Sequence, residues 1–258
     1  MIECDVLVVG AGPAGSVAAL YCSKHGLDAV LIEKSEKVGA HTNTRIDTSP
    51  DFELTDIINE LRLKTEGVAY TSRWYSPLGR SFTLNSKIGE YYFKRGPEPD
   101  SFECSTVKKT VKHDCKLFLN TVIKKIDKKE GKFHKAMAIQ DREEIVIKPK
   151  IIIAADGGNS FFHKYLNEKI KKEARVGYGV TGKKFGEPNI SEIYFDAELA
   201  PGGYFYTVTC PSGVSSAAII LNRNKIEKSP KKYFEKFISK NQKLADRIKL
   251  ITNTFAGE

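Results

Sequence analysis

Three glycines near the start of the sequence have the spacing of a turn that holds the phosphates of a nucleotide. They are Gly10, Gly12 and Gly15, within the stretch Gly-Ala-Gly-Pro-Ala-Gly. Gly10 permits a tight turn, the missing Cβ of Gly12 lets a pyrophosphate approach the backbone, and Gly15 lets a helix pack closely against a strand. Pro13 and Ala14 complete the turn, so we predict that these five residues bind a dinucleotide cofactor.

The elements around this turn must follow a fixed order to place the phosphates. Apolar runs predict strands over residues 6–9 and 29–32, and the segment 16–25 between them has helical character. The N-terminal N–H groups of that helix would face the phosphates. Glu33 ends the second strand, where its carboxylate would accept hydrogen bonds from a ribose hydroxyl and repel a 2′-phosphate; Lys34 follows it. A glycine-rich turn in another kind of α/β protein is the alternative interpretation.

A second turn has the composition of a ligand site. The apolar strand predicted over residues 150–155 ends at Asp156 and Gly157, and a helix is predicted from residue 161 after Ser160. The turn would bring the Asp156 carboxylate and backbone amides against a polar ligand, unless Asp156 only caps the helix. Because this strand and the first one would lie in one sheet with adjacent carboxyl ends, we expect both turns to serve one site.

The polar loop predicted over residues 39–50 can also reach a ligand at this sheet edge, and it carries Arg45. A cation there suits an anionic cofactor, and a surface salt bridge is the alternative. For the remaining chain we expect helices over residues 52–63, 101–114 and 229–251, the last as a pair, and strands over residues 69–75, 80–84, 89–94, 116–126 (one strand or two), 133–140, 143–147, 176–185, 190–195, 203–210 and 215–221.

These elements predict an α/β fold with two interleaved domains. A Rossmann-like cofactor domain would comprise residues 1–67 and 95–175, and an antiparallel-sheet substrate domain would comprise residues 68–94 and 176–258. The strands of the second domain would form one substrate-facing sheet. The shift from parallel to hairpin patterns marks the boundary between the two domains.

The composition indicates which partners and which cellular compartment suit the protein. The 258 residues carry a net charge of +9 from dispersed lysines, which suits a solvated surface, an anionic substrate or a membrane surface better than nucleic acid, since no nucleic-acid-binding motif is present. Five cysteines without a CxxC motif predict neither a metal site nor a disulfide framework, as in a reducing cytoplasm. We expect no signal peptide and no transmembrane span, and a cytoplasmic location with peripheral membrane contact.

Taken together, the motifs resemble those of the hydroxylase-type FAD family, with a fold of the glutathione-reductase and p-hydroxybenzoate-hydroxylase type. The first unit alone does not separate FAD from NAD; the resemblance implies FAD. Within that family the sequence is most similar to the geranylgeranyl reductases. Their substrate-sheet motif has a tyrosine, a tryptophan and a phenylalanine-proline pair in succession, and Tyr204, Tyr206 and Cys210-Pro211 resemble it.

The sequence departs from the family pattern at several positions. Tyr206 replaces the tryptophan, Cys210 replaces the phenylalanine before the proline, and the motif is longer by two residues. His163 stands where hydroxylases have an arginine, and Ile46-Asp47 replaces a cysteine and glycine after Arg45. The third family signature, a strand leading to Gly-Asp and a helix facing the flavin, would follow the last residues of this sequence, so we expect weak FAD binding and poor activity.

The resemblance implies a reaction and leaves three functions open. An FAD-dependent reductase would transfer hydride to a carbon–carbon double bond of an isoprenoid lipid, in an apolar tunnel lined by the strand over residues 203–210. Tyr204 and Tyr206 are candidate proton donors, although strand tyrosines also serve packing. The alternatives are an aromatic hydroxylase and a catalytically silent FAD-binding chain. The sequence does not identify the electron donor.

Overall fold

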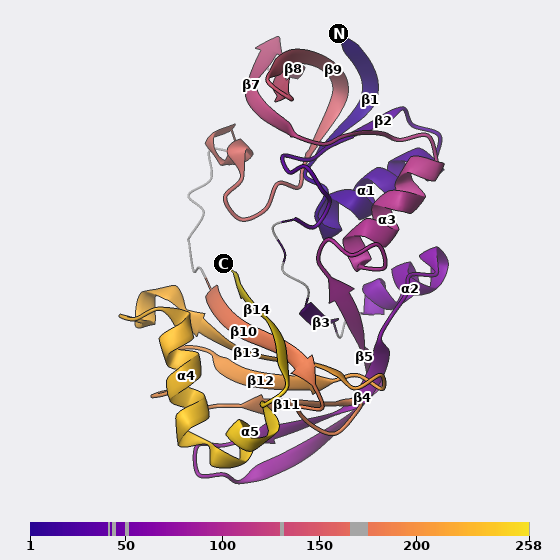
Figure 1. Cartoon of the computed structure of the whole chain (residues 1–258). Coiled ribbons are helices and arrows are strands. Elements are labelled where there is room, and N and C mark those ends of the chain that lie inside the picture. The colour runs from indigo at the N-terminus through magenta and orange to yellow at the C-terminus, as the bar shows by residue number, and fades with distance from the viewer. Residues whose placement is uncertain (41, 43–44, 50–51, 130–131, 166–174, 258) are drawn as a thin grey trace. The chain divides into compact units, whose positions relative to one another are not determined.

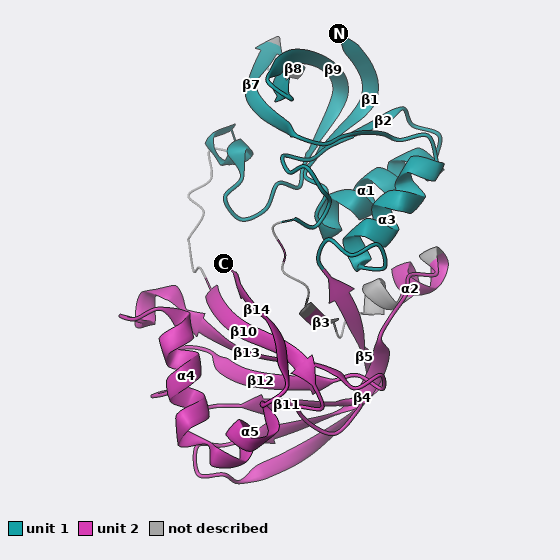
Figure 2. Ribbon diagram, viewed as in Figure 1, with its two compact units in different colours: residues 1–41, 96–170 teal, residues 42–95, 171–258 magenta. Residues whose placement is uncertain are grey.

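The structure is a computed structural model of the chain. It describes all residues except 41, 43–44, 50–51, 130–131, 166–174 and 258. The chain forms two compact units (Figure 2), which are described one at a time: residues 1–41 with 96–170, and residues 42–95 with 171–258.

The first unit contains a six-stranded sheet with the strand order β6-β2-β1-β9-β8-β7. Its centre is β1 (Ile2–Val9), which pairs in parallel with β2 (Ala29–Ile32) on one side and with β9 (Glu143–Ala154) on the other. Val9 lies beside Ile32 and beside Ala154, so the carboxyl ends of the three strands meet at one edge. This confirms the predicted adjacency of the two turns.

The other strands of this sheet are β6 (Lys116–Phe118), β7 (Thr121–Lys129) and β8 (Lys132–Gln140). We predicted two separate strands over residues 143–147 and 150–155, but β9 is continuous. Its first half pairs with β8 and its second half with β1, and Ile147 pairs with both neighbours. The exchange of partners explains why one strand has two different sequence patterns.

Helices α1 (Pro13–Lys24) and α3 (Phe102–Lys112) pack together on one face of this sheet (Figure 1). Ala19 and Val107 join Val8 and Leu31 in the core beneath them. The Ser101 hydroxyl accepts the Cys104 N–H at 3.3 Å and caps α3, as Ser at this position favours. A second core, which includes Phe162 of the short 3-10 helix η1 (Phe161–Tyr165), fills the other side of the sheet.

The second unit contains an eight-stranded sheet with the strand order β14-β10-β13-β12-β11-β4-β5-β3. It unites all the strands that we assigned to one substrate-facing sheet. Their bounds are β4 (Gly67–Tyr75), β5 (Ser81–Arg95), β10 (Arg175–Lys183), β11 (Ile190–Tyr194), β12 (Tyr204–Thr209) and β13 (Val214–Asn222).

Three features of this sheet differ from the prediction. Strand β3 (Arg45–Ser49) lies inside the predicted loop 39–50 and pairs with the end of β5. The predicted strands 80–84 and 89–94 are one strand, since β5 pairs with β4 on both sides of an irregularity near Ala69. Strand β14 (Ile251–Gly257) was not predicted and pairs with β10. These polar or interrupted strands form because a neighbouring strand satisfies their backbone groups.

The grouping of residues 42–67 also differs from the predicted domain division. Strand β3 and helix α2 (Phe52–Leu61) belong to the second unit, since β3 pairs with β5. The predicted boundaries placed them in the cofactor domain, and which residues act with which domain in function stays a prediction.

Helices α4 (Pro230–Lys240) and α5 (Gln242–Arg247) cover one face of the second sheet (Figure 1), and η2 (Arg223–Lys225) precedes them. Phe237 of α4 stacks on Phe205 of β12 with a ring-centroid distance of 4.5 Å. Because side chains alternate along a strand, Tyr204 and Tyr206 face the opposite side of the sheet. No described helix is long and apolar enough to cross a membrane.

A buried carboxylate holds α5 against this sheet. Arg247 makes a bidentate ion pair with Glu192 of β11, and its Nε donates to the Phe185 carbonyl at 2.6 Å. The Thr207 hydroxyl also donates to Glu192, at 2.8 Å. Burial alone would raise the pKa of Glu192, but Arg247 outweighs burial and holds the pKa below its usual value.

We predict that Arg247→Met lowers the free energy of unfolding by about 3 kcal/mol, because it removes the bidentate partner of a buried carboxylate and leaves it only Arg73, at 3.9 Å, as a cation. In the parent, the stability from this pair is present above pH 4.5, the ordinary pKa of a glutamate, and is lost as the pH falls below it. Urea unfolding at a series of pH values measures both effects. Lys236→Met, which breaks an exposed pair with Glu198, is the control and should change stability by less than about 1 kcal/mol.

Candidate dinucleotide-binding site

At Gly10 and Gly15 of the first turn, neighbouring backbone atoms leave no room for a side chain. A Cβ on Gly10, whose φ is +101°, would lie 2.4 Å from the carbonyl oxygen of Ala155. A Cβ on Gly15 would lie 1.8 Å from the carbonyl oxygen of Gly10. No real side chain tolerates either distance, so these glycines let the ends of β1 and β9 and the start of α1 converge.

Gly12 differs, because nothing lies within 4 Å of the position a Cβ would take. Its backbone is extended, and it precedes α1 without any side-chain cap. Pro13 occupies the first turn of the helix, where its missing N–H costs nothing, and Ala14 is exposed. The first turn contains no acid. Open space before uncapped helical amides is what an approaching pyrophosphate needs.

Glu33 joins the turn to the end of β2. Its Oε2 accepts the Ala11 N–H at 2.9 Å, and its Oε1 accepts the Ser35 N–H at 3.0 Å and the Ser35 hydroxyl at 2.7 Å. A carboxylate has about four acceptor positions, so the capacity to bind a ribose hydroxyl is not exhausted. We did not predict the role of Ser35, although a serine two residues after an acid can return a hydrogen bond to it.

Asp156 lies at the neighbouring turn and has two different oxygens. Its Oδ2 accepts the Phe161 N–H at 2.7 Å, so Asp156 does cap the start of η1. Its Oδ1 is buried and has no hydrogen-bond partner among the described residues. A buried acceptor without a partner is costly, and a ligand donor would relieve that cost. Gly157, with φ of +89°, has open space around its Cβ position, as does Gly158.

The remaining predicted residues are distributed over both units. Lys34 is exposed next to Glu33. Arg45 contributes its backbone to β3 in the second unit, and its side chain lies outside the described residues. The Ser160 hydroxyl accepts the Phe162 N–H at 3.0 Å, and His163 lies in η1. No group of metal-ligating side chains is found in the part of the chain that the structure describes.

The two candidate tyrosines lie together in the second unit. Tyr204 and Tyr206 are on β12, half-buried, with ring centroids 6.3 Å apart. Tyr206 packs against a cluster that contains Val208 and Ile46. The pair thus occupies the face of the sheet opposite to α4 and α5.

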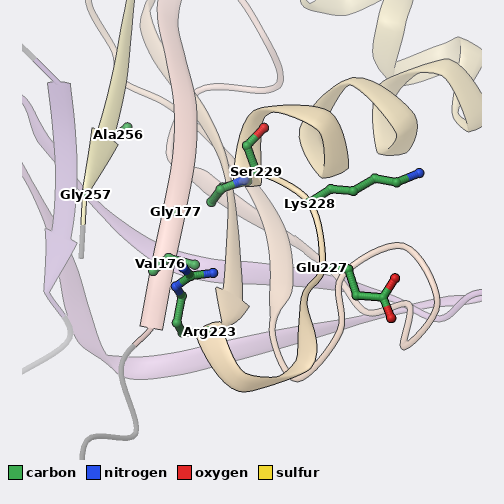
Figure 3. Close-up of a pocket in the computed structure, with 9 residues that line it drawn as sticks. Val176, Gly177, Arg223, Glu227, Lys228, Ser229, Ala256 and Gly257 are labelled. Atoms are coloured by element: carbon green, nitrogen blue, oxygen red, sulfur yellow. The ribbon is translucent and has the colours of Figure 1, made fainter.

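A separate groove of about 630 Å³ lies in the second unit between the ends of β10 and β14 and the start of α4 (Figure 3). It contains none of the predicted site residues. Arg223, Glu227 and Lys228 line it, but their charged ends point away from one another. They do not converge on one ion.

Two segments of the chain match models of known protein families. Residues 8–60 match the family model of the NAD(P)-binding Rossmann-like domain, and residues 172–257 match that of the geranylgeranyl reductase catalytic domain. A digeranylgeranylglycerophospholipid reductase of Methanocaldococcus jannaschii is 30% identical over 95% of this chain and 61% of its own length. The chain thus spans about three fifths of that relative.

Solved structures share the fold. A geranylgeranyl bacteriochlorophyll reductase-like protein of Thermoplasma acidophilum superposes with a TM-score of 0.83, at 24% identity, over 100% of this chain and 66% of its own. The myxobacterial FAD-dependent halogenase CndH gives a TM-score of 0.80 at 12% identity, over 100% of this chain and 64% of its own.

The chain therefore has a Rossmann-type flavoprotein fold, in which a dinucleotide-binding unit is followed by a mainly antiparallel sheet that contains one parallel pair, β4 with β11. Residues 172–257 match the catalytic domain of the geranylgeranyl reductases, and the chain is similar over 95% of its length to the digeranylgeranylglycerophospholipid reductase of M. jannaschii.

We predict that Gly15→Ala costs much more stability than Gly12→Ala. The added methyl of Gly15→Ala would meet the Gly10 carbonyl, so the free energy of unfolding should fall by about 3 kcal/mol. Gly12→Ala adds its methyl in open space and should cost less than about 1 kcal/mol. Thermal unfolding followed by circular dichroism compares the two, and equal losses would contradict this account of the turn.

Proposed function

We propose that this chain binds FAD and reduces carbon–carbon double bonds in the geranylgeranyl chains of a lipid. The match of residues 172–257 to the geranylgeranyl reductase catalytic domain is the observation that carries the proposal. The name of the M. jannaschii relative, digeranylgeranylglycerophospholipid reductase, suggests a glycerophospholipid with two such chains as the substrate.

The first turn supports FAD as the cofactor. Open space at Gly12, the uncapped start of α1 and the partnerless Asp156 Oδ1 are the features that a dinucleotide would use. In this assignment the amides of Ala14 and Gly15 bind the pyrophosphate, Glu33 accepts a ribose hydroxyl, and Asp156 accepts a hydroxyl of the ligand. Reduced flavin, when bound, supplies the hydride that an alkene needs.

The chain's own residues must perform the other tasks of the reaction. An isolated alkene accepts hydride poorly, so the site has to orient it, exclude water and deliver a proton. The aromatic face around Tyr204 and Tyr206 would bind the prenyl chain and exclude water. We assign the proton to the hydroxyl of one of these two tyrosines.

The substrate suggests the place where the protein works. A lipid with two prenyl chains resides in a membrane, so we propose that the chain works at the cytoplasmic membrane surface. The net charge of +9 would favour contact with anionic headgroups.

The hydroxylase alternative rests on fold alone, because its solved neighbours are less than 25% identical to this chain, as for aklavinone-11 hydroxylase at 14%. The proposal is tested by supplying dithionite and a geranylgeranyl glycerophospholipid to the purified, FAD-loaded protein. Saturated chains detected by mass spectrometry would support it. Flavin absorption without saturated product would contradict it, and a protein without flavin absorption even after reconstitution would favour a catalytically silent chain.

We predict that Gly12→Val prevents FAD binding while the fold persists, because its side chain would occupy the space of the pyrophosphate. Fluorescence titration with FAD measures affinity, and circular dichroism checks the fold. A folded Gly12→Val protein with the parent's affinity would show that the pyrophosphate does not approach this residue.

We predict that Glu33→Ala weakens FAD binding by about 1–3 kcal/mol, since it removes the acceptor for a ribose hydroxyl. Ser35→Ala is the matched control, because it removes only one donor to Glu33 and leaves the carboxylate in place. It should change FAD affinity by less than about 1 kcal/mol. Equal affinity in Glu33→Ala and parent would reduce Glu33 to a structural residue.

We predict that the proton-donating tyrosine is identified by its phenylalanine variant. Tyr204→Phe or Tyr206→Phe should lower kcat by about 10²-fold or more at the donor, with KM little changed because the ring remains. Single-turnover kinetics with dithionite-reduced protein measures this. If neither variant is slower than the parent, the proton comes from another group.

A further inference from the structure

The helix-free face of the second sheet carries a continuous line of five aromatic rings, which we call the aromatic row: Phe82, Trp74, Phe195, Tyr204 and Tyr206. Successive ring centroids are 5.7, 5.3, 6.3 and 6.3 Å apart. The rings come from β5, β4, the end of β11, and β12, so the row crosses four neighbouring strands. Only Tyr204 and Tyr206 belong to the motif that the sequence indicated.

The positions beside the aromatic row are apolar. Ile193 pairs with Trp74 and with Tyr206, and Ala218 pairs with Tyr206. One residue away along the strands, on the face that α4 and α5 cover, lie Arg73 and Glu192. The helix-free face does carry the carboxylate of Glu90, which accepts the hydroxyl of Ser191, two residues along β11 from Ile193.

The aromatic row is accessible for a large apolar ligand. Phe82 is 55% exposed and Phe195 is 38% exposed. The indole N–H of Trp74 donates to the Ser72 hydroxyl at 3.0 Å, so its polar atom is satisfied and the ring presents apolar surface. At the other end, Tyr206 packs against the apolar cluster that contains Ile46 of β3, and β3 also touches β13 and β10, so the sheet curls toward this face. A concave surface with a continuous row of aromatic rings favours an elongated apolar occupant.

We propose that the aromatic row is the binding track for one prenyl chain, with each step between neighbouring rings accommodating about one isoprene unit. This inference rests on the proposed function. The row is continuous with Tyr204 and Tyr206 inside the matched catalytic domain, and it extends that surface to Trp74 and Phe82, which lie outside the match. Four steps join the five rings, and a geranylgeranyl chain has four isoprene units. Trp74 and Phe82 thus set the length of chain that the protein prefers.

The sequence provides a direct probe of this track, because Trp74 is the single tryptophan of the chain. Titration with geraniol, farnesol and geranylgeraniol, with excitation selective for tryptophan, should give tighter binding with each added isoprene unit. Geranylgeraniol should also shift the Trp74 emission to shorter wavelength, since the ligand replaces water beside the indole. Unchanged emission at saturating geranylgeraniol would overturn the proposal.

Phe82→Ala shortens the track by one ring and leaves the other four. It should weaken geranylgeraniol binding about tenfold, whereas geraniol, which can use the remaining rings, should bind as it does to the parent. Leu78→Ala, at the exposed tip of the hairpin between β4 and β5 and outside the row, is the matched control and should change neither affinity. Equal losses for all three alcohols in Phe82→Ala would indicate unspecific apolar binding and overturn the proposal.

Two other occupants of this face give different results. Emission that shifts with anionic phospholipid vesicles but not with geranylgeraniol, and that depends on Leu78, would identify a membrane contact instead. Emission that shifts with protein concentration alone, together with a dimer in sedimentation, would identify a second copy of the chain. Either result would overturn the prenyl track.

The binding assay needs neither FAD nor turnover, so its failure is distinct from that of the proposed function. Chain-length-dependent binding without saturated product would leave the track in place and contradict the reductase activity. Saturated product from a protein whose Trp74 emission ignores geranylgeraniol, and whose KM is unchanged by Phe82→Ala, would contradict the track alone.

Discussion

The close approach of three backbone segments at one sheet edge is the constraint on which the first unit depends. Gly15 meets the Gly10 carbonyl, and Gly10 meets the Ala155 carbonyl, so α1, β1 and β9 converge where no Cβ could fit. The convergence brings the turn that contains Gly12, with open space at its Cβ position, against the turn at Asp156, whose Oδ1 has no partner among the described residues. Packing thus creates the site, and the ligand would use what packing leaves open.

In the second unit, an ion pair determines which face of the sheet the helices cover. Glu192 and Arg247 place a buried ion pair under α5, and this pair fixes the helical layer on one side of the sheet. Buried ion pairs add little net stability, but they specify one arrangement, because a misplaced partner leaves a charge uncompensated. The other face of the sheet carries the aromatic row. Along β12, side chains alternate between the two faces. Phe205 packs against α4, and Tyr204 and Tyr206 belong to the aromatic row on the opposite face.

In both units the atoms that we propose to bind ligands lie where regular structure ends or is left uncovered. In the first unit these are the turn amides and carboxylates at the carboxyl ends of parallel strands, the usual ligand edge of such sheets. In the second they are ring faces on strands. Polar recognition of a cofactor and apolar recognition of a chain need such different surfaces that a fold serving both benefits from two sheets.

The sequence by itself determined the cofactor unit, because glycine spacing, helix period and the acid after β2 act over short range. It predicted the meeting of the two turns, since the strands before them read as parallel and buried. It could not predict β3 or β14, whose polar residues become strands only beside β5 and β10. It also could not join Trp74 to Phe195 and Tyr204, which are far apart in sequence and meet only through the pairing of β4, β11 and β12. A binding turn is built from residues that are adjacent in sequence, so the sequence predicts it. A surface that crosses several strands forms only when those strands pair in the sheet.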